Sequence, residues 1–72
     1  MNNCYPGVLD FYLGRIEFAM KGNFTQRLDM LDMILRAAGY DDMLNPDEYR
    51  VILDNVKKAH IKTMEDNYNG NW

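Results

Sequence analysis

The sequence predicts an all-α protein, a compact three-helix bundle with short connections. Proline, glycine and helix-capping residues divide its 72 residues into three segments, and apolar side chains recur within each segment at helical spacing. No segment shows the alternation of apolar and polar residues, bounded by hairpin turns, that is typical of a strand. A chain of this length supports one domain at most, so we expect residues 1–72 to form a single helical domain.

The first helix is expected over residues 6–21. Pro6 suits a first helical turn, where its missing N–H is no loss, and Gly22 suits the left-handed position that follows a helix. This segment is the most apolar of the three, because hydrophobic residues cover more than half of its circumference. Gly14 lies in its interior and Arg15 interrupts the apolar arc.

The second helix is expected over residues 24–38, before Gly39. Asn23 is a good N-cap, and Gln26 three residues later can complete a capping box. Its main apolar stripe consists of Phe24, Leu28, Leu31, Ile34, Leu35 and Ala38. A second apolar cluster, formed by Met30, Met33 and Ala37, lies to one side and widens the arc beyond the roughly 100° that one buried face requires.

The third helix is expected over residues 46–66 and has the clearest start signal. Asn45 can cap it, Pro46 takes the first position, and Glu48 can reach back to complete a capping box. Lysines and a histidine follow in what we expect to be the last turns, where they suit the negative end of the helix dipole. The predicted buried stripe is Tyr49, Ile52, Leu53, Val56, Ala59, His60 and Met64. Residues 67–72 are expected to be a flexible tail.

The composition excludes several kinds of site. One cysteine, one histidine and no serine rule out a disulfide framework, a Cys/His zinc site and a serine nucleophile. Cys4 and His60 could pair as thiolate and imidazole, but they are far apart in the chain and lack a cysteine-protease context. The acidic stretch over residues 41–48 lacks the glycine turn of a calcium loop. We therefore expect neither an enzyme nor a cofactor or metal.

The predicted partner-binding surface comes from apolar residues that the chain has too little interior to hide. Hydrophobic residues make up 47% of the sequence, while a domain this small buries only about 60% of its unfolded surface. The excess is clustered on helical faces, which is typical of a contact surface. The predicted contact residues are Phe11, Phe18, Met20, Met30 and Met33. Alternatively, the first helix is apolar on two sides only because it packs against both other helices.

Asp41 and Asp42 form an acidic corner between the second and third helices and are a further candidate contact site. An exposed acidic corner can attract a basic partner, whereas its simpler interpretation is a solvated turn before a capped helix. The net charge of -3 agrees with either interpretation.

The leading hypothesis is a small non-enzymatic protein–protein interaction module, which binds itself as a homodimer or binds a larger protein as an inhibitor or regulator. Size, acidity and the lack of catalytic motifs are also typical of small accessory proteins of phages and mobile elements. The alternative is a DNA-binding regulator using Lys58 and Lys62 of the third helix; Asp47 and Glu48 at its start would repel phosphates, so nucleic acid is not favoured. Without a basic leader or a long apolar run, a cytoplasmic location with no membrane partner is expected.

Overall fold

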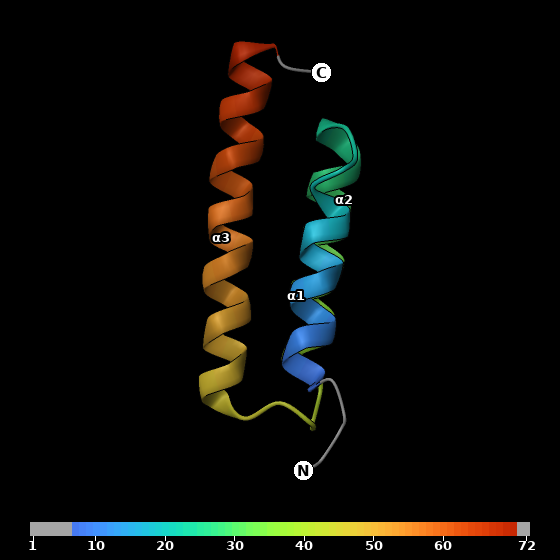
Figure 1. Ribbon diagram of the computed structural model, residues 1–72, viewed down its shortest axis with the longest axis vertical. Coiled ribbons are helices and arrows are strands. Elements are labelled where there is room, and N and C mark those ends of the chain that lie inside the picture. The colour runs from blue at the N-terminus through green and yellow to red at the C-terminus, as the bar shows by residue number, and fades with distance from the viewer. Residues whose placement is uncertain (1–6, 71–72) are drawn as a thin grey trace.

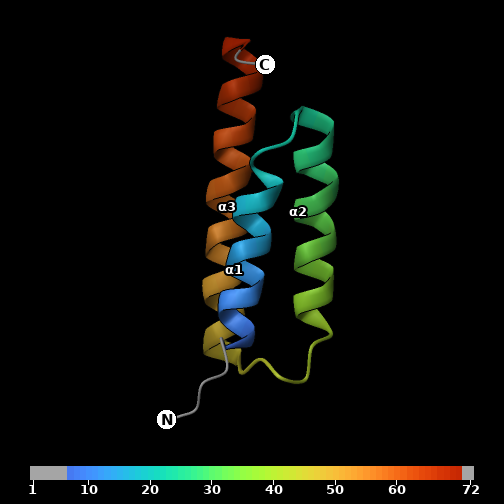
Figure 2. The same ribbon diagram turned by 45° about the vertical axis from the view of Figure 1, so that its right-hand side comes forward.

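The computed structural model describes residues 7–70 and contains three α-helices, which confirms the predicted all-α three-helix bundle. They are α1 (Val8–Ala19), α2 (Phe24–Gly39) and α3 (Pro46–Asn69). α1 and α2 form an antiparallel pair, and α3 packs against both of them (Figures 1 and 2). α3 has 24 residues and α1 has 12, so the C-terminal part of α3 extends beyond the turn that joins α1 to α2 (Figure 1).

The first helix is shorter than predicted, since it spans Val8–Ala19 instead of residues 6–21. Pro6 lies outside the described residues, and Gly7 is the N-cap. The helix ends early because Asn23 is already extended as the N-cap of α2, so residues 20–22 must turn the chain. The predicted left-handed backbone at Gly22 is wrong. Gly22 instead permits close packing, because an added Cβ would lie 2.8 Å from Gln26 Oε1.

Both predicted capping boxes are confirmed. The Gln26 N–H donates to Asn23 Oδ1 (2.9 Å), and the Asn23 N–H donates back to Gln26 Oε1 (3.0 Å). Asn45 and Glu48 make the same reciprocal pair at the start of α3, with Pro46 as its first residue. These local bonds satisfy N–H groups that a helix leaves unpaired, so they fix where α2 and α3 begin.

The helix ends differ from the predicted ones. α2 includes Gly39, one residue more than expected. α3 continues to Asn69, so residues 67–69 are helical and the prediction of a tail from residue 67 is wrong there. No helix breaker precedes Gly70, whose left-handed backbone (φ 69°) ends the helix. The last turn of α3 holds no basic residue, so the predicted pairing of lysines with that end is also wrong.

The core lies along the axis of the bundle, where each helix contributes three buried apolar residues. These are Tyr12, Ile16 and Ala19 of α1, Leu31, Ile34 and Ala38 of α2, and Ile52, Val56 and Ala59 of α3. The buried seam of α3 continues with Thr63 and Asp66 at spacings of four and three residues, whereas the predicted Met64 is 49% exposed. The sequence pattern missed these two residues because both are polar.

Gly14 is a weak point in α1. A Cβ added there would meet no atom within 4 Å, so within residues 7–70 no other backbone requires glycine at this position. Glycine inside a helix is about 1 kcal/mol less favourable than alanine. We expect Gly14→Ala to raise the free energy of unfolding by about 0.5 to 1 kcal/mol in urea denaturation. Gly22→Ala is the matched control and should be destabilising, because its Cβ would clash with Gln26.

Candidate functional site

Apolar side chains from α1 and α2, most of them exposed, surround one arginine on a surface that we call the α1/α2 face. It consists of Phe11, Arg15 and Phe18 of α1 with Met30, Met33 and Ala37 of α2. Phe11 is 60% exposed, Phe18 is 58% exposed and Met33 is 65% exposed, although all three are large and apolar. The structure therefore brings together four of the five apolar residues predicted from sequence, from both predicted helices.

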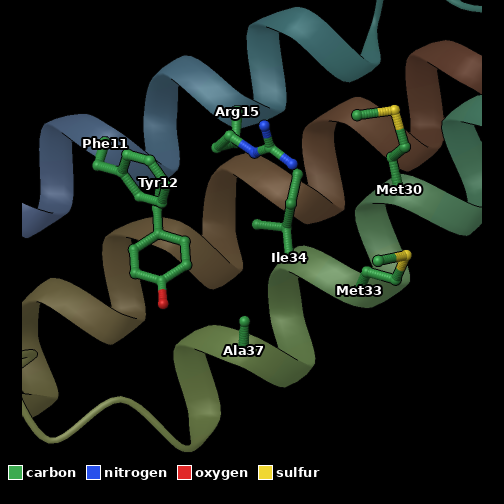
Figure 3. A pocket seen from close by; sticks show the side chains of 7 residues that line it. All are labelled: Phe11, Tyr12, Arg15, Met30, Met33, Ile34 and Ala37. Carbon is green, nitrogen blue, oxygen red and sulfur yellow. The ribbon is translucent and has the colours of Figure 1, made fainter.

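Two hollows lie along this face and share Met30 as a wall. The first, of about 200 Å³, is lined by Phe11, Tyr12, Arg15, Met30, Met33, Ile34 and Ala37 (Figure 3). The second, of about 410 Å³, is lined by Phe18, Lys21, Gly22, Gln26, Asp29 and Met30. Figure 3 shows the Arg15 side chain extending from α1 toward Ile34 of α2, with Tyr12 and Ala37 nearby. Both hollows are open, and the first is smaller than the usual small-molecule pocket.

Met20, the fifth predicted apolar contact residue, lies apart from this face. It is half-buried and packs against the core, and its sulfur lies 3.7 Å from the Thr63 hydroxyl of α3. That hydroxyl donates to the Ala59 carbonyl oxygen (2.7 Å), so Thr63 is satisfied within α3. Met20 thus helps join the end of α1 to α3.

Of the two predicted acidic residues, Asp41 is bound within the fold and Asp42 is exposed. The Tyr12 hydroxyl donates to Asp41 Oδ2 (2.7 Å), and the Met43 N–H donates to Asp41 Oδ1 (2.8 Å). The Tyr12 bond and then the Met43 bond lower the pKa of Asp41 below its ordinary value of 3.8. This carboxylate therefore fastens the α2–α3 connection to α1 and is less available to a partner than Asp42.

The same contact predicts the behaviour of Tyr12 in alkali. Burial, followed by the hydrogen bond and charge of Asp41, raises the pKa of Tyr12 from 10.0 to about 12. Because the pKa of Tyr12 is higher in the folded state than in the unfolded chain, the protonated hydroxyl stabilises the fold. This contribution to the free energy of unfolding is complete below pH 10 and is lost as the pH rises to about 12. Tyr12→Phe should remove the tyrosinate absorbance that develops near pH 12 and should reduce the alkaline loss of stability. An unchanged absorbance titration would contradict this assignment.

Sequence reasoning missed the main polar contact of the bundle, between Arg27 of α2 and Asp66 of α3. Arg27 Nη1 lies 2.7 Å from Asp66 Oδ2, and both side chains are largely buried. Lys62 Nζ lies 3.2 Å from Asp66 Oδ1, so one of the lysines of the predicted basic cluster is already paired. The Arg27 bond, followed by the Lys62 contacts, lowers the pKa of Asp66 despite its burial. The seven-residue repeat of the α3 seam is the signal that could have placed Asp66 inside.

The residues considered for chemistry do not form a reactive group within residues 7–70. Cys4 lies outside the described residues, so its pairing with His60 has no structural description. His60 is half-buried, and its buried Nε2 atom has no hydrogen-bond partner among the described residues. Over the same residues, no three His, Cys, Asp or Glu side chains are placed to hold a metal ion. No helix of residues 7–70 has the length and apolar character to cross a membrane.

Apolar side chains are also exposed on α3, where Ile61, Met64 and Tyr68 recur at spacings of three and four residues. Charged residues surround this second stripe, among them Lys58, Lys62 and Glu65. The stripe belongs to one helix, whereas the α1/α2 face combines two helices around two hollows. The α1/α2 face is therefore the stronger candidate for a binding site.

Comparisons of the chain with protein-family models, with curated proteins and with solved structures found no match.

Proposed function

We propose that this protein is a small non-enzymatic interaction module that binds another protein through the α1/α2 face. The observation that supports it best is the grouping of Phe11, Phe18 and Met33, each more than half exposed, around two hollows on adjacent helices. Contiguous exposed apolar surface is typical of protein contact sites, and aromatic residues and methionine are enriched in such sites.

Inhibition or regulation of a larger protein is the form of this function that suits the chain. The chain exposes aromatic side chains on a face whose two helices are packed on a common core. Such a face can bind a partner with little rearrangement. Asp42 and its acidic neighbours at the α2–α3 connection are placed to attract a basic region of such a partner from a distance. Occupation of the face by a second copy is the competing version of the proposal.

Phe11→Asp tests the proposed function, with Ile61→Asp as its matched control. Both residues are 60% exposed, but Ile61 lies on α3 away from the α1/α2 face. Loss of a central aromatic contact costs about 2 kcal/mol or more, which is roughly thirty-fold in affinity. In affinity capture from the native cell followed by mass spectrometry, a partner retained by the wild type and by Ile61→Asp should be lost by Phe11→Asp.

Light scattering during size-exclusion chromatography separates the two versions of the proposal. A wild-type dimer that Phe11→Asp converts to a monomer would identify a second copy as the occupant. A monomeric wild type at high concentration would leave a foreign partner. If Phe11→Asp retained every partner, or if only Ile61→Asp lost one, the α1/α2 face would not be the binding site.

A further inference from the structure

Arg15 is an unpaired cation within the apolar α1/α2 face. It lines the first hollow together with aromatic and aliphatic side chains, and its guanidinium makes no hydrogen bond or ion pair with residues 7–70. The residues three and four positions away on α1 are all uncharged, so the helix itself offers no carboxylate. By contrast, Arg27 and Arg36 each have an acidic partner within the fold.

A partner that covers this face must supply a group that neutralises Arg15. Docking on the hollow removes water from the guanidinium, and a desolvated charge without a counter-charge opposes binding. A carboxylate is the matching group, because its two oxygens accept two parallel hydrogen bonds from a guanidinium. We therefore expect the partner surface to be apolar, with one Asp or Glu opposite Arg15.

The spacing of the face fits a helix. Phe11, Arg15 and Phe18 are separated by four and three residues, so they lie along one side of α1 over about 10.5 Å of helix rise. Phe11 lines the first hollow and Phe18 lines the second. A partner helix lying along the α1/α2 face presents side chains seven residues apart at the same separation, as in other complexes in which a helix binds between two helices.

We infer that the α1/α2 face takes an amphipathic helix from a partner protein. Its apolar side chains at two positions seven residues apart enter the two hollows, and an Asp or Glu between them, three or four residues from each, binds Arg15. This inference rests on the proposed function and specifies the chemistry of its partner.

A second copy of the chain fits this face less well. A twofold arrangement that places Phe11 of one copy against Phe18 of the other is centred between residues 14 and 15 of α1. It would bring the Arg15 side chains of both copies close together in an apolar interface without a carboxylate between them. The repulsion between these like charges opposes self-association in this register.

Selection from a displayed library of helical peptides tests the inference. Wild-type protein should enrich peptides with apolar residues seven positions apart and Asp or Glu between them. Arg15→Glu should lower the affinity of a selected peptide at least tenfold in fluorescence anisotropy, and a Glu→Lys change in that peptide should restore binding to the variant. Arg50→Glu is the matched control, since Arg50 is an exposed arginine of α3 without an ion pair in residues 7–70, and it should change nothing.

The other outcomes separate this inference from the proposed function. If selected peptides lost affinity with Phe11→Asp but not with Arg15→Glu, the inference would be overturned and the proposed function would stand. If they lost affinity with neither, or if no peptide were enriched, the helix-binding assignment would be overturned, and capture with Phe11→Asp would decide the proposed function separately. If the wild type were a dimer that Phe11→Asp dissociates, the occupant of the α1/α2 face would be a second copy and not a partner helix.

Discussion

Replacing Leu31 with alanine is expected to lower the free energy of unfolding by about 3 kcal/mol. Leu31 is fully buried, at 0% exposure, on the face of α2 that meets α1 and α3. Its truncation removes buried apolar surface and leaves a cavity, and the neighbouring helices close that cavity only partly. A chain of this length has a total stability of about 4 to 11 kcal/mol, so this single change removes a large part of it.

Urea denaturation followed by circular dichroism measures this effect, with Met33→Ala as the control. Met33 is on the same helix but 65% exposed, and its truncation should change stability by less than about 0.5 kcal/mol. Equal effects of the two substitutions would mean that the face of α2 assigned to the core is wrong. The same control has a second use, because a Met33→Ala protein that is folded but binds its partner weakly would support the α1/α2 face.

Most of the fold follows from local signals in the sequence. Asn23 with Gln26, and Asn45 with Glu48, satisfy helix N–H groups through residues only three positions apart, so sequence alone fixes these two starts. Helix ends are harder to predict, because they depend on contacts distant in sequence or on a single left-handed residue. The predicted end of α3 at residue 66 is three residues short, because the helix continues to Asn69 and ends only at the left-handed Gly70.

The candidate site could be predicted in part. The excess of apolar residues predicts Phe11 and Phe18 of the first helix as contact residues, and helical periodicity puts Met30 and Met33 on one side of the second helix. In the fold these residues line two adjoining hollows. Periodicity shows on which side of a helix a residue lies, but it does not show which neighbouring helix packs against that side. Met20, which the prediction groups with Phe18, lies two residues beyond it, so its side chain points about 200° away around the helix and contacts Thr63 of α3.

Arg27→Met is expected to lower the free energy of unfolding by about 2 kcal/mol, the second large effect. Arg27 Nε donates to the Gly22 carbonyl oxygen (2.9 Å), and its Nη1 donates to Asp66 Oδ2 (2.7 Å), so one side chain joins the α1–α2 turn to α3. Hydrogen bonds that involve a charged group stabilise more than neutral ones, especially where the side chains are largely buried. Arg36→Met is the matched control, because the Asp32–Arg36 pair is exposed and should contribute less than about 0.5 kcal/mol.

The pH dependence of the Arg27→Met effect identifies its cause. The Arg27 hydrogen bond is the main reason that the pKa of Asp66 in the folded state lies below its ordinary value of 3.8. A lowered folded-state pKa stabilises the fold above that ordinary value, and the stabilisation is lost as the pH falls through the folded-state pKa. The difference in Tm between wild type and Arg27→Met should therefore be constant near neutral pH and shrink below about pH 4. A difference that stayed constant down to pH 2 would show that Arg27 acts through its packing and its bond to Gly22, and not through the charge of Asp66.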